Sequence, residues 1–343
     1  MEYSKLIPIM DKDQIQYRFF EKIKVKLPPN ISLVVAVAET LDISNDSAYR
    51  RIRCEKQISL EELQKLSKQF KISLDELLLV QSDSFIFNGR ITNNSDFKYD
   101  NWLETCVYHL ETIGKYTPNH MYYLAKEIPF FYYFLIPEIA ALKSFFFMKS
   151  ILDYEDWKNV KFSVKDDYSK YQLLCKKISD TFASIPSTEI WSIENITSTI
   201  QQIEFYRVTG SLKSDDDALV LYEKLDELIN HIEKQAECGF KLKAGQESAN
   251  SGPAHKMFVN EITMGDNMQI MQLGNTQLTY INHSIINFIT TSDLAFNTYM
   301  KQTFDNIAHK STPISVENQK DRLMFFNRLR VKVANARKVV IQN

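Results

Sequence analysis

The sequence predicts a mainly α-helical protein of the α+β class: a small five-helix domain, then a larger, mostly helical domain with a small antiparallel sheet. Two observations predict this. Capping residues and prolines divide residues 13–80 into short helices. Further on, five of the eight glycines lie between Gly239 and Gly274, among short strand-like segments. The predicted domains are residues 1–81 and 101–343, joined by a polar, turn-rich linker at 82–100.

Composition limits the classes of protein to consider. The chain has 343 residues, 44% of them hydrophobic and 24% charged, a balance typical of soluble globular proteins. Its net charge of -2 gives no general basic character, so any nucleic-acid site must be local. No secretory signal is visible. The cysteines are too widely spaced for a disulfide framework or a zinc ribbon, so we expect a reducing, cytoplasmic location; they are Cys54, Cys106, Cys175 and Cys238.

One apolar segment, Ile128–Met148, is long enough to span a bilayer. Glu138 and Lys143 lie near its middle, however, and each costs about 2.5–3.5 kcal/mol on insertion scales. Pro137 also interrupts the run. We therefore predict a buried helix over Pro137–Leu152, entered through an aromatic segment, and no membrane partner.

The N-terminal helices have clear start and stop signals. Pro28 ends the first, because proline lacks the backbone donor. Ser59 with Glu62 fits a capping box, as Ser73 with Glu76 does. The predicted helices are Asp13–Lys26, one from about Leu33 to Leu41, Ser44 to about Cys54, Leu60–Phe70 and Leu74–Val80.

The second and third helices are joined by a short turn, which is the arrangement of a helix-turn-helix. In that motif the later helix enters the DNA major groove. On a helix over Ser44–Lys56, Ala48 and Ile52 share the core face. Asn45 would lie at the end pointing into the groove, together with Asp46. The opposite, solvent face presents Asp46, Ser47, Tyr49, Arg50 and Arg53.

These residue types suit DNA. Asparagine makes bidentate contacts with adenine and arginine with guanine. Serine hydroxyls and the free N–H groups of a first helical turn suit phosphate oxygens. The predicted DNA-binding residues are Ser44, Asn45, Asp46, Ser47, Tyr49, Arg50, Arg53 and Lys56.

Local charge agrees with this prediction only modestly. Residues 12–58 carry nine Lys or Arg and six Asp or Glu, a net charge of +3. We therefore expect few phosphate contacts, with dimerisation adding affinity for double-stranded DNA. The alternative is that the arginines form only the solvated face of a small helical bundle.

Residues Leu33–Leu78 resemble the lambda-repressor-like (Xre/BetR-type) helix-turn-helix family of bacterial transcription regulators. The resemblance implies a five-helix fold, insertion of the Ser44–Cys54 helix into the major groove, and dimeric operator binding. One position departs from the family, because many members carry glycine near Cys54, where the recognition helix ends. The segment Ile289–Ser315 is similar to sensor domains of bacterial regulators, phospholipase-D-like ones included, but the H-x-K-x-x-x-x-D motif is absent.

The larger region alternates long helices with a few short strands. A two-residue hairpin is predicted at Gly274-Asn275, because glycine tolerates the positive φ that such turns need. The predicted helices are Tyr99–Tyr116, Pro137–Leu152, Tyr168–Ser184, Ile193–Val208, Asp215–Gln235, Ser292–His309 and one from Ser315 toward Val340. The predicted strands are Met257–Thr263, Met268–Leu273, Thr276–Ile281 and Ile285–Thr291.

The role of this region is open at the level of sequence. We expect it to sense a small-molecule or protein effector, to form a homodimer, or both. The aromatic cluster would either line an apolar pocket or fill an ordinary core; it comprises Phe130, Phe131, Tyr132, Tyr133, Phe134, Phe145, Phe146 and Phe147. The last helix has a net charge of +6 between Lys320 and Lys338 and an apolar stripe through Leu323 and Phe326. It would dock on the domain, or face a second subunit, DNA or an anionic membrane.

No constellation for catalysis is visible. The six histidines show no helical pairing, and the common nucleotide-binding, zinc-protease and serine-hydrolase motifs are absent. The acidic run Asp215–Asp217 is read as the first turn of a helix capped by Ser214 and not as a metal site. We predict no enzyme and no cofactor. The alternative function is an enzyme or protein-interaction module that uses the N-terminal helices for docking.

Overall fold

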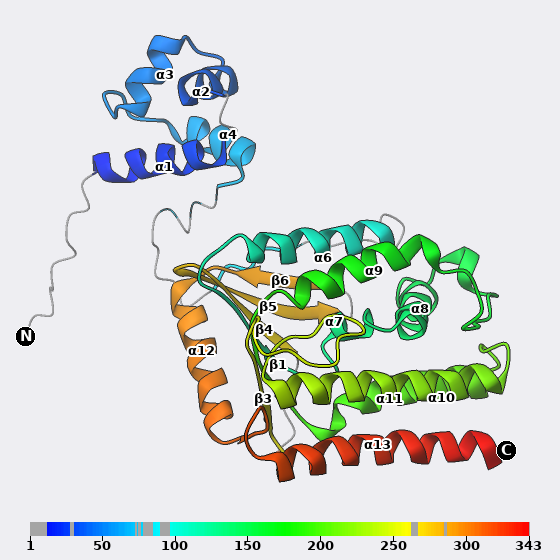
Figure 1. The fold of residues 1–343 in the computed structure, drawn as a ribbon. Coiled ribbons are helices and arrows are strands. Elements are labelled where there is room, and N and C mark those ends of the chain that lie inside the picture. The colour runs from blue at the N-terminus through cyan, green and yellow to red at the C-terminus, as the bar shows by residue number, and fades with distance from the viewer. Residues whose placement is uncertain are drawn as a thin grey trace, which may run out of the picture. The chain divides into compact units, whose positions relative to one another are not determined.

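The computed structural model describes residues 12–27, 31–72, 74, 77, 85–89, 97–261, 267–284 and 287–342. The chain divides into two compact units, Met1–Ser84 and Phe85–Asn343 (Figure 1). The α+β class is confirmed, with helices predominating in both units.

The smaller unit contains helices within a residue or two of the predicted bounds. They are α1 (Lys12–Lys26), α2 (Leu33–Leu41), α3 (Asn45–Ile52) and α4 (Leu60–Phe70). The predicted fifth helix, Leu74–Val80, falls almost wholly outside the described residues. Phe19, Phe20 and Ile23 of α1 are buried against α2, α3 and α4. Each helix therefore contributes one apolar face to a single core.

The turn between α2 and α3 is only three residues long. Asp42 adopts the left-handed conformation at φ 54°, and the Ile43 amide donates to the Ala38 carbonyl at 3.0 Å, the bond that defines a Schellman motif. Ser44 then caps α3, its hydroxyl accepting from the Ser47 amide at 3.3 Å. The chain thus stops one helix and starts the next within three residues, as predicted.

Arg51 joins α3 to the start of α4. Its side chain is 6% exposed, and the guanidinium donates to both carboxylate oxygens of Glu62, at 2.9 and 2.6 Å. Glu62 also accepts from the Ser59 amide at 3.2 Å, which completes the predicted capping box of α4. The arginines of the run 50–53 therefore differ in role: Arg51 is buried and joins two helices, while Arg50 and Arg53 remain exposed.

Helix α3 ends at Ile52, earlier than predicted, and Cys54 has a positive φ of 60°. This is the position where the resemblance led us to expect glycine. Left-handed backbone costs an L-residue about 1–2 kcal/mol, and glycine avoids that cost. We expect Cys54→Gly to raise the free energy of unfolding of the smaller unit by about 1 kcal/mol.

Hydrogen exchange of the α1–α4 amides in the full-length protein measures this gain. Cys54→Ala is the matched control, because it removes the thiol but keeps a Cβ. Equal effects of the two variants would contradict a backbone origin.

The sheet of the larger unit is mixed, so the prediction of a small antiparallel sheet is wrong. Its order is β6-β5-β4-β1-β2-β3-β7. The central β1, β2 and β3 are mutually parallel, and the remaining pairs are antiparallel. The strands are β1 (Asn119–Leu124), β2 (Ser187–Trp191), β3 (His255–Val259), β4 (Met268–Leu273), β5 (Thr276–Ser284), β6 (Asn287–Thr291) and β7 (Thr312–Pro313).

Four of these strands match predicted ones, and the predicted hairpin is present. Leu273 pairs with Thr276, which leaves Gly274 and Asn275 as a two-residue loop, with Gly274 at φ 59°. The missed strands include β1 and β2. Strand β2 is buried at all five positions, so it lacks the alternation of apolar and polar residues that marks a half-exposed strand.

The helices of the larger unit confirm the predicted ones to within a few residues at most ends, and the four-residue α7 is an additional, unpredicted helix. They are α6 (Tyr99–Gly114), α7 (Phe130–Tyr133), α8 (Pro137–Phe146), α9 (Ser169–Phe182), α10 (Thr197–Val208), α11 (Asp215–Cys238), α12 (Leu294–His309) and α13 (Gln319–Gln342). Helix α8 continues as a π-helical turn, Phe147–Ile151, and short 3₁₀ turns form at Glu155–Trp157 and Ile193–Ile196. Within the described residues, no helix has both the length and the apolarity to cross a membrane.

Different helices pack on the two faces of the sheet (Figure 1). Met121 and Tyr123 of β1 point into the main core, which they share with α6 to α11 and α13. Tyr122 and Leu124, one residue out of phase, point to the other face and pack under Phe304 of α12. The main core is thus thick and aromatic on one side, and a single helix closes the other side.

Helix α13 docks along α11, as one of the predicted alternatives stated. Phe326, Leu329 and Val333 are buried there, whereas Leu323 is 45% exposed and does not belong to the apolar stripe. Several of its basic residues pair within the unit: Arg330 with Glu233, Lys332 with Glu194 and Arg328 with Glu261. The positive charge of this helix is therefore partly neutralised by its own domain.

Part of the predicted linker belongs to the larger unit. The backbones of Asn88 and Thr290 exchange hydrogen bonds of 2.7 and 2.8 Å. Phe85 and Phe87 each contact Phe296 edge-on, at centroid distances of 5.0 and 5.1 Å. The chain is thus anchored on α12 and β6 from residue 85, and α6 starts at Tyr99.

Candidate nucleic-acid interface and ligand cavity

The predicted DNA-binding residues lie together at α3 and the loop after it. A helix turns about 100° per residue, so the exposed positions 45, 46, 49, 50 and 53 span an arc of about 140°. Ala48 and Arg51 occupy the buried arc opposite, with Ser47 and Ile52 half-buried at the edges. Lys56 is exposed in the loop, where its amide donates to the Arg50 carbonyl at 3.2 Å.

The N-terminal end of this face is already organised. The hydroxyls of Ser44 and Ser47 are 3.1 Å apart, and Ser44 also accepts from the Ser47 amide. Asn45 and Asp46 are exposed, and their side chains form no hydrogen bond with another described residue. The Asn45 amide and the Asp46 carboxylate therefore remain available to an external partner, while Ser44 and Ser47 fix the start of the helix.

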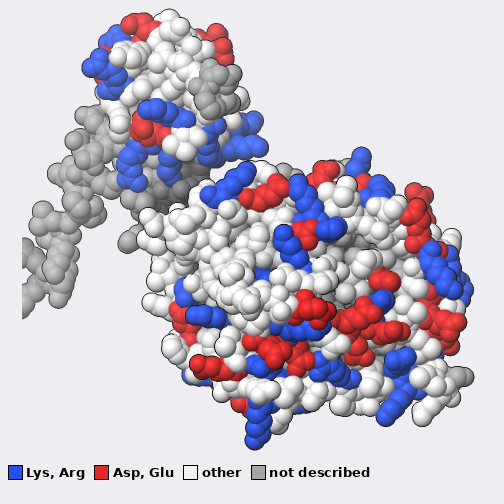
Figure 2. Space-filling model, viewed as in Figure 1, with Lys and Arg blue, Asp and Glu red and all other residues white. Residues whose placement is uncertain are grey.

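The middle of the face carries two arginines with different surroundings. Arg53 lies over the Tyr49 ring at 5.5 Å and pairs with Glu55 at 3.4 Å. Within the described part of the chain, Arg50 has no acidic partner. Figure 2 shows Lys and Arg side chains gathered over α1 and at the α3 end of this unit. The free guanidinium of Arg50 is thus the strongest candidate for a base or phosphate contact.

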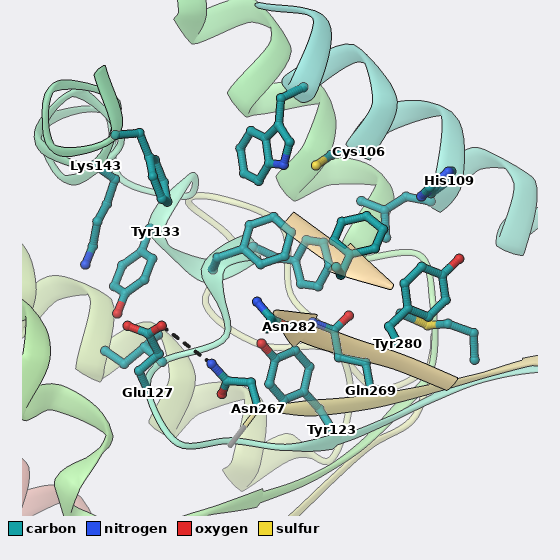
Figure 3. A pocket seen from close by; sticks show the side chains of 18 of the residues that line it. Cys106, His109, Tyr123, Glu127, Tyr133, Lys143, Asn267, Gln269, Tyr280 and Asn282 are labelled. Atoms are coloured by element: carbon teal, nitrogen blue, oxygen red, sulfur yellow. Dashed lines mark hydrogen bonds between the residues drawn. The ribbon is translucent and has the colours of Figure 1, made fainter. Parts of the chain in front are cut away.

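The larger unit holds a cavity of about 80 Å³ between α6, α7, α8 and the sheet (Figure 3). This volume exceeds what one water molecule needs. Aromatic side chains form a large part of its wall, among them Trp102, Phe130, Phe131, Tyr133, Phe147, Tyr280 and Phe288. Polar side chains enter from one side and from the sheet, among them Glu127, Lys143, Gln202, Asn267, Gln269 and Asn282.

The aromatic cluster of the sequence divides between this cavity and the core. Phe130, Phe131 and Tyr133 line the cavity, as do Phe146 and Phe147. The remaining members do not line it: Tyr132, Phe134 and Phe145 are buried elsewhere in the core. Both sequence-level interpretations therefore hold, each for part of the cluster.

Lys143 is the charged residue most deeply set in the cavity wall, at 3% exposure. Its Nζ donates to Thr199 Oγ1 at 3.0 Å and to Gln202 Oε1 at 2.8 Å. It also lies 3.9 Å from the centre of the Tyr133 ring. Burial lowers the pKa of Lys143 to about 8, so it is still mostly protonated at neutral pH.

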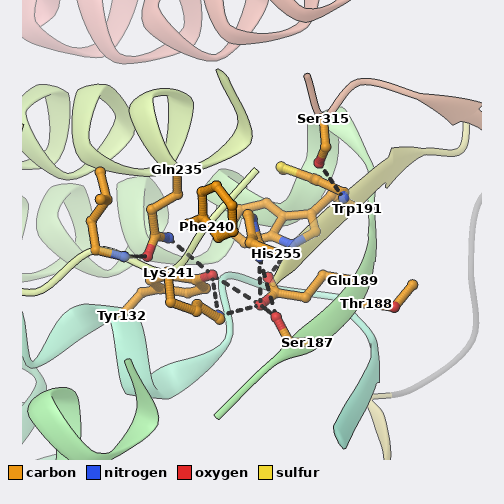
Figure 4. Close-up of polar contacts among 12 residues, drawn as sticks. Tyr132, Ser187, Thr188, Glu189, Trp191, Gln235, Phe240, Lys241, His255 and Ser315 are labelled. Carbon is orange, nitrogen blue, oxygen red and sulfur yellow. Dashed lines mark hydrogen bonds and ion pairs between the residues drawn. The ribbon is translucent and has the colours of Figure 1, made fainter. Parts of the chain in front are cut away.

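A second polar cluster lies in the core at β2 (Figure 4). Glu189 and Lys241 have side chains with 0% exposure and form an ion pair of 2.7 Å. Glu189 also accepts from Tyr132 at 2.9 Å, from Ser187 at 2.8 Å and from Trp191 at 2.9 Å. The carboxylate is therefore saturated with donors, the condition under which a buried charge is tolerated.

This cluster holds residue types found in catalytic triads, but its geometry is structural. Ser187 Oγ lies 3.2 Å from His255 Nδ1, and both side chains are buried. Burial would raise the pKa of Glu189, but the charge and hydrogen bond of Lys241, together with the hydrogen bond from Ser187, outweigh it and lower the pKa to about 2. Burial lowers the pKa of His255 to about 3, so the imidazole is neutral. None of these residues lines the cavity described above.

Metal chemistry has no support either. Within the described part of the chain, no three His, Cys, Asp or Glu side chains gather where they would hold a metal ion. The acidic run at α11 is a helix start, as predicted: the hydroxyl of Ser214 accepts from the Asp217 amide, and Asp217 bonds Ser163 at 2.7 Å.

Comparison of the chain with family models, with curated proteins and with solved structures gave no match. The geometry of the two sites is therefore the basis for a functional proposal. The residues missed from the sequence are Arg51, Lys143, Glu189, Lys241 and His255. Among them Lys143 has a signal in the sequence, because it is a charged residue inside the apolar segment 128–148, and such residues are rarely buried without a partner. Arg51, beside Arg50, and His255, beside Lys256, have no such surroundings.

Proposed function

We propose that the chain is a sequence-specific, DNA-binding transcription regulator. In this proposal α3 is the recognition helix, and the smaller unit is a lambda-repressor-like domain. The larger unit senses an effector and contributes to dimerisation. The observation that carries the proposal is the exposed arc of α3, where Asn45, Arg50 and Arg53 face solvent together.

Three features support this assignment. The turn before α3 is short and well capped, so the orientation of the helix relative to α2 is fixed by backbone hydrogen bonds. Arg51 is withdrawn into a bidentate contact with Glu62, which anchors the inner side of α3. The outer side chains are of the kinds that read base edges and contact phosphates.

Dimerisation belongs to the proposal because one such helix offers few phosphate contacts. Two helices on two half-sites about one helical turn apart would double them. Selection of bound sequences from random duplex DNA tests this directly. A palindromic site is the expected outcome, and enrichment of a single unrepeated half-site would contradict the dimer.

The recognition helix is tested by Asn45→Ala combined with Arg50→Ala. Affinity of the intact protein for its selected site is expected to fall about tenfold or more, because each lost base contact costs about 1–3 kcal/mol. Mobility shift at low salt is the appropriate measurement, since phosphate contacts weaken steeply with ionic strength.

Lys65→Ala is the matched control. Lys65 is exposed on α4, outside the α3 face, and has the same charge as Arg50. We expect this variant to change affinity about twofold at most, because it removes only a general electrostatic contribution. Equal binding by the double variant and the wild type would rule out α3 as the recognition helix.

A further inference from the structure

The cavity of the larger unit contains an unusual polar feature for an aromatic pocket. Lys143 is one of its lining residues, and within the described residues no carboxylate oxygen lies within 4 Å of the Lys143 Nζ. Its two hydrogen-bond acceptors, Thr199 and Gln202, are neutral. A buried ammonium is normally paired with an anion, because desolvation penalises an unpaired charge heavily.

The groups around Lys143 define what such an anion would meet. Figure 3 shows Lys143, Tyr133 and Glu127 on the same side of the cavity. Glu127 is held by Ser198 at 3.1 Å and by Asn267 at 3.5 Å. A second negative charge on a ligand would therefore be repelled at this end, which favours a monoanion over a dianion.

The other walls favour an apolar, flat ligand body. Trp102, Phe130 and Phe147 line the cavity, and the ring centres of Phe130 and Phe147 each lie 5.6 Å from that of Trp102. Aromatic walls suit another ring, and burying apolar surface there removes it from water, which is favourable. Asn282 and Gln269 reach in from the sheet and would fix the orientation of a polar substituent.

We propose that this cavity binds a small organic monoanion, a carboxylate on an apolar and preferably aromatic body. The carboxylate pairs with Lys143, and the body lies against Phe130 and Phe147. This inference rests on the proposed function in that it names the ligand class for the sensing role of the larger unit.

A series of matched probes tests the ligand class with the intact protein. The probes are 3-phenylpropionate, 3-phenylpropan-1-ol, 3-phenylpropylamine, phenylalanine and succinate, with binding followed by calorimetry and saturation-transfer NMR. We expect 3-phenylpropionate to bind about tenfold or more tightly than the alcohol, and the amine and succinate to bind more weakly still. Binding of the alcohol or amine as tight as that of the acid would overturn the proposal. Tighter binding of phenylalanine would also overturn it, since Glu127 would then be pairing with a ligand ammonium.

The variant Lys143→Met isolates the proposed ion pair. Its affinity for 3-phenylpropionate is expected to fall about tenfold or more, while its affinity for the alcohol changes about twofold at most. Retained alcohol binding shows that the cavity is intact. Lys177→Met on α9 is the control, because Lys177 is an exposed lysine paired with Glu111 and does not line the cavity.

The outcomes separate this inference from the proposed function. Probe binding is measured without DNA, and the α3 variants are measured without probes. Failure of every probe at millimolar concentration overturns the cavity assignment and leaves the recognition helix standing. If the α3 double variant and its control both bind DNA as the wild type does, the recognition helix is overturned and the cavity assignment still stands.

Discussion

Replacing Lys241 with Met is expected to lower the free energy of unfolding of the larger unit by about 3–5 kcal/mol. Lys241 is the buried cation beside Glu189, and it also donates to Tyr132 Oη at 2.8 Å. Its Nζ lies 3.7 Å from the centre of the Phe182 ring. Without it, Glu189 would keep an uncompensated buried charge or take up a proton, and either change penalises the folded state.

A double-mutant cycle separates the ion pair from the loss of methylene contacts. Glu189→Gln in the Lys241→Met background removes the remaining charge, and its one amide oxygen can still accept from Trp191. Its amide N–H₂ would face the Ser187 hydroxyl, which can accept a hydrogen bond as well as donate one. We expect the double variant to recover a large part of the loss, because a neutral buried pair has no unpaired charge. Chemical denaturation, followed by fluorescence, measures all the variants.

Lys177→Met is again the matched control, here for stability. Lys177 pairs with Glu111 at 2.8 Å, and about half of its side chain is exposed. Exposed ion pairs contribute about 0–1 kcal/mol, so this variant should be nearly as stable as the wild type. Similar small losses for Lys177→Met and Lys241→Met would show that Glu189 is not desolvated.

Local signals predicted most helices of the fold. The capping boxes at Ser59 and Ser214 both form, and each satisfies backbone donors within four residues of itself. The hairpin at Gly274 also depends on neighbouring residues alone. Features of this kind can be read from sequence because their partners are a few positions apart.

The centre of the sheet could not be predicted in the same way. Met121 of β1 pairs with Ser187 of β2 and with Met271 of β4, positions far apart in the chain. Strand β2 is short and buried on both faces, so its five residues lack a periodic pattern. The parallel pairing of β1 with β2 and the antiparallel pairing of β1 with β4 therefore follow from the tertiary fold and not from local signals.

The candidate sites also differ in how far the sequence predicts them. The exposed face of α3 was predictable, because one capped helix presents all its residues. From the sequence, Lys143 is a charge that argues against a membrane span, whereas its place in the cavity wall depends on α6, α7, α10 and the sheet. The Glu189 cluster joins β2, β3 and the loop after α11, three segments whose proximity follows only from the tertiary fold.

Acidification from about pH 6.5 to about pH 4 is expected to destabilise the larger unit, with His255 alone contributing about 3 kcal/mol. Burial lowers the folded-state pKa of His255 to about 3, against an ordinary value of 6.5. The unfolded chain therefore binds the proton first, and the stabilisation present above pH 6.5 is lost as the pH falls. Burial also lowers the pKa of His120 and His231, each to about 4, so both act in the same direction.

The pH range separates these histidines from Glu189. With its pKa lowered to about 2, Glu189 loses its contribution only below its ordinary value of 4.5. Denaturation midpoints between pH 7 and 5 therefore report the histidines. His255→Gln should make this pH dependence shallower, whereas His309→Gln, at an exposed position on α12, should leave it unchanged. The same pH dependence of the midpoint in the wild type and both variants would mean that solvent reaches His255 in the native state. The polar cluster at β2 would then not be shielded from water.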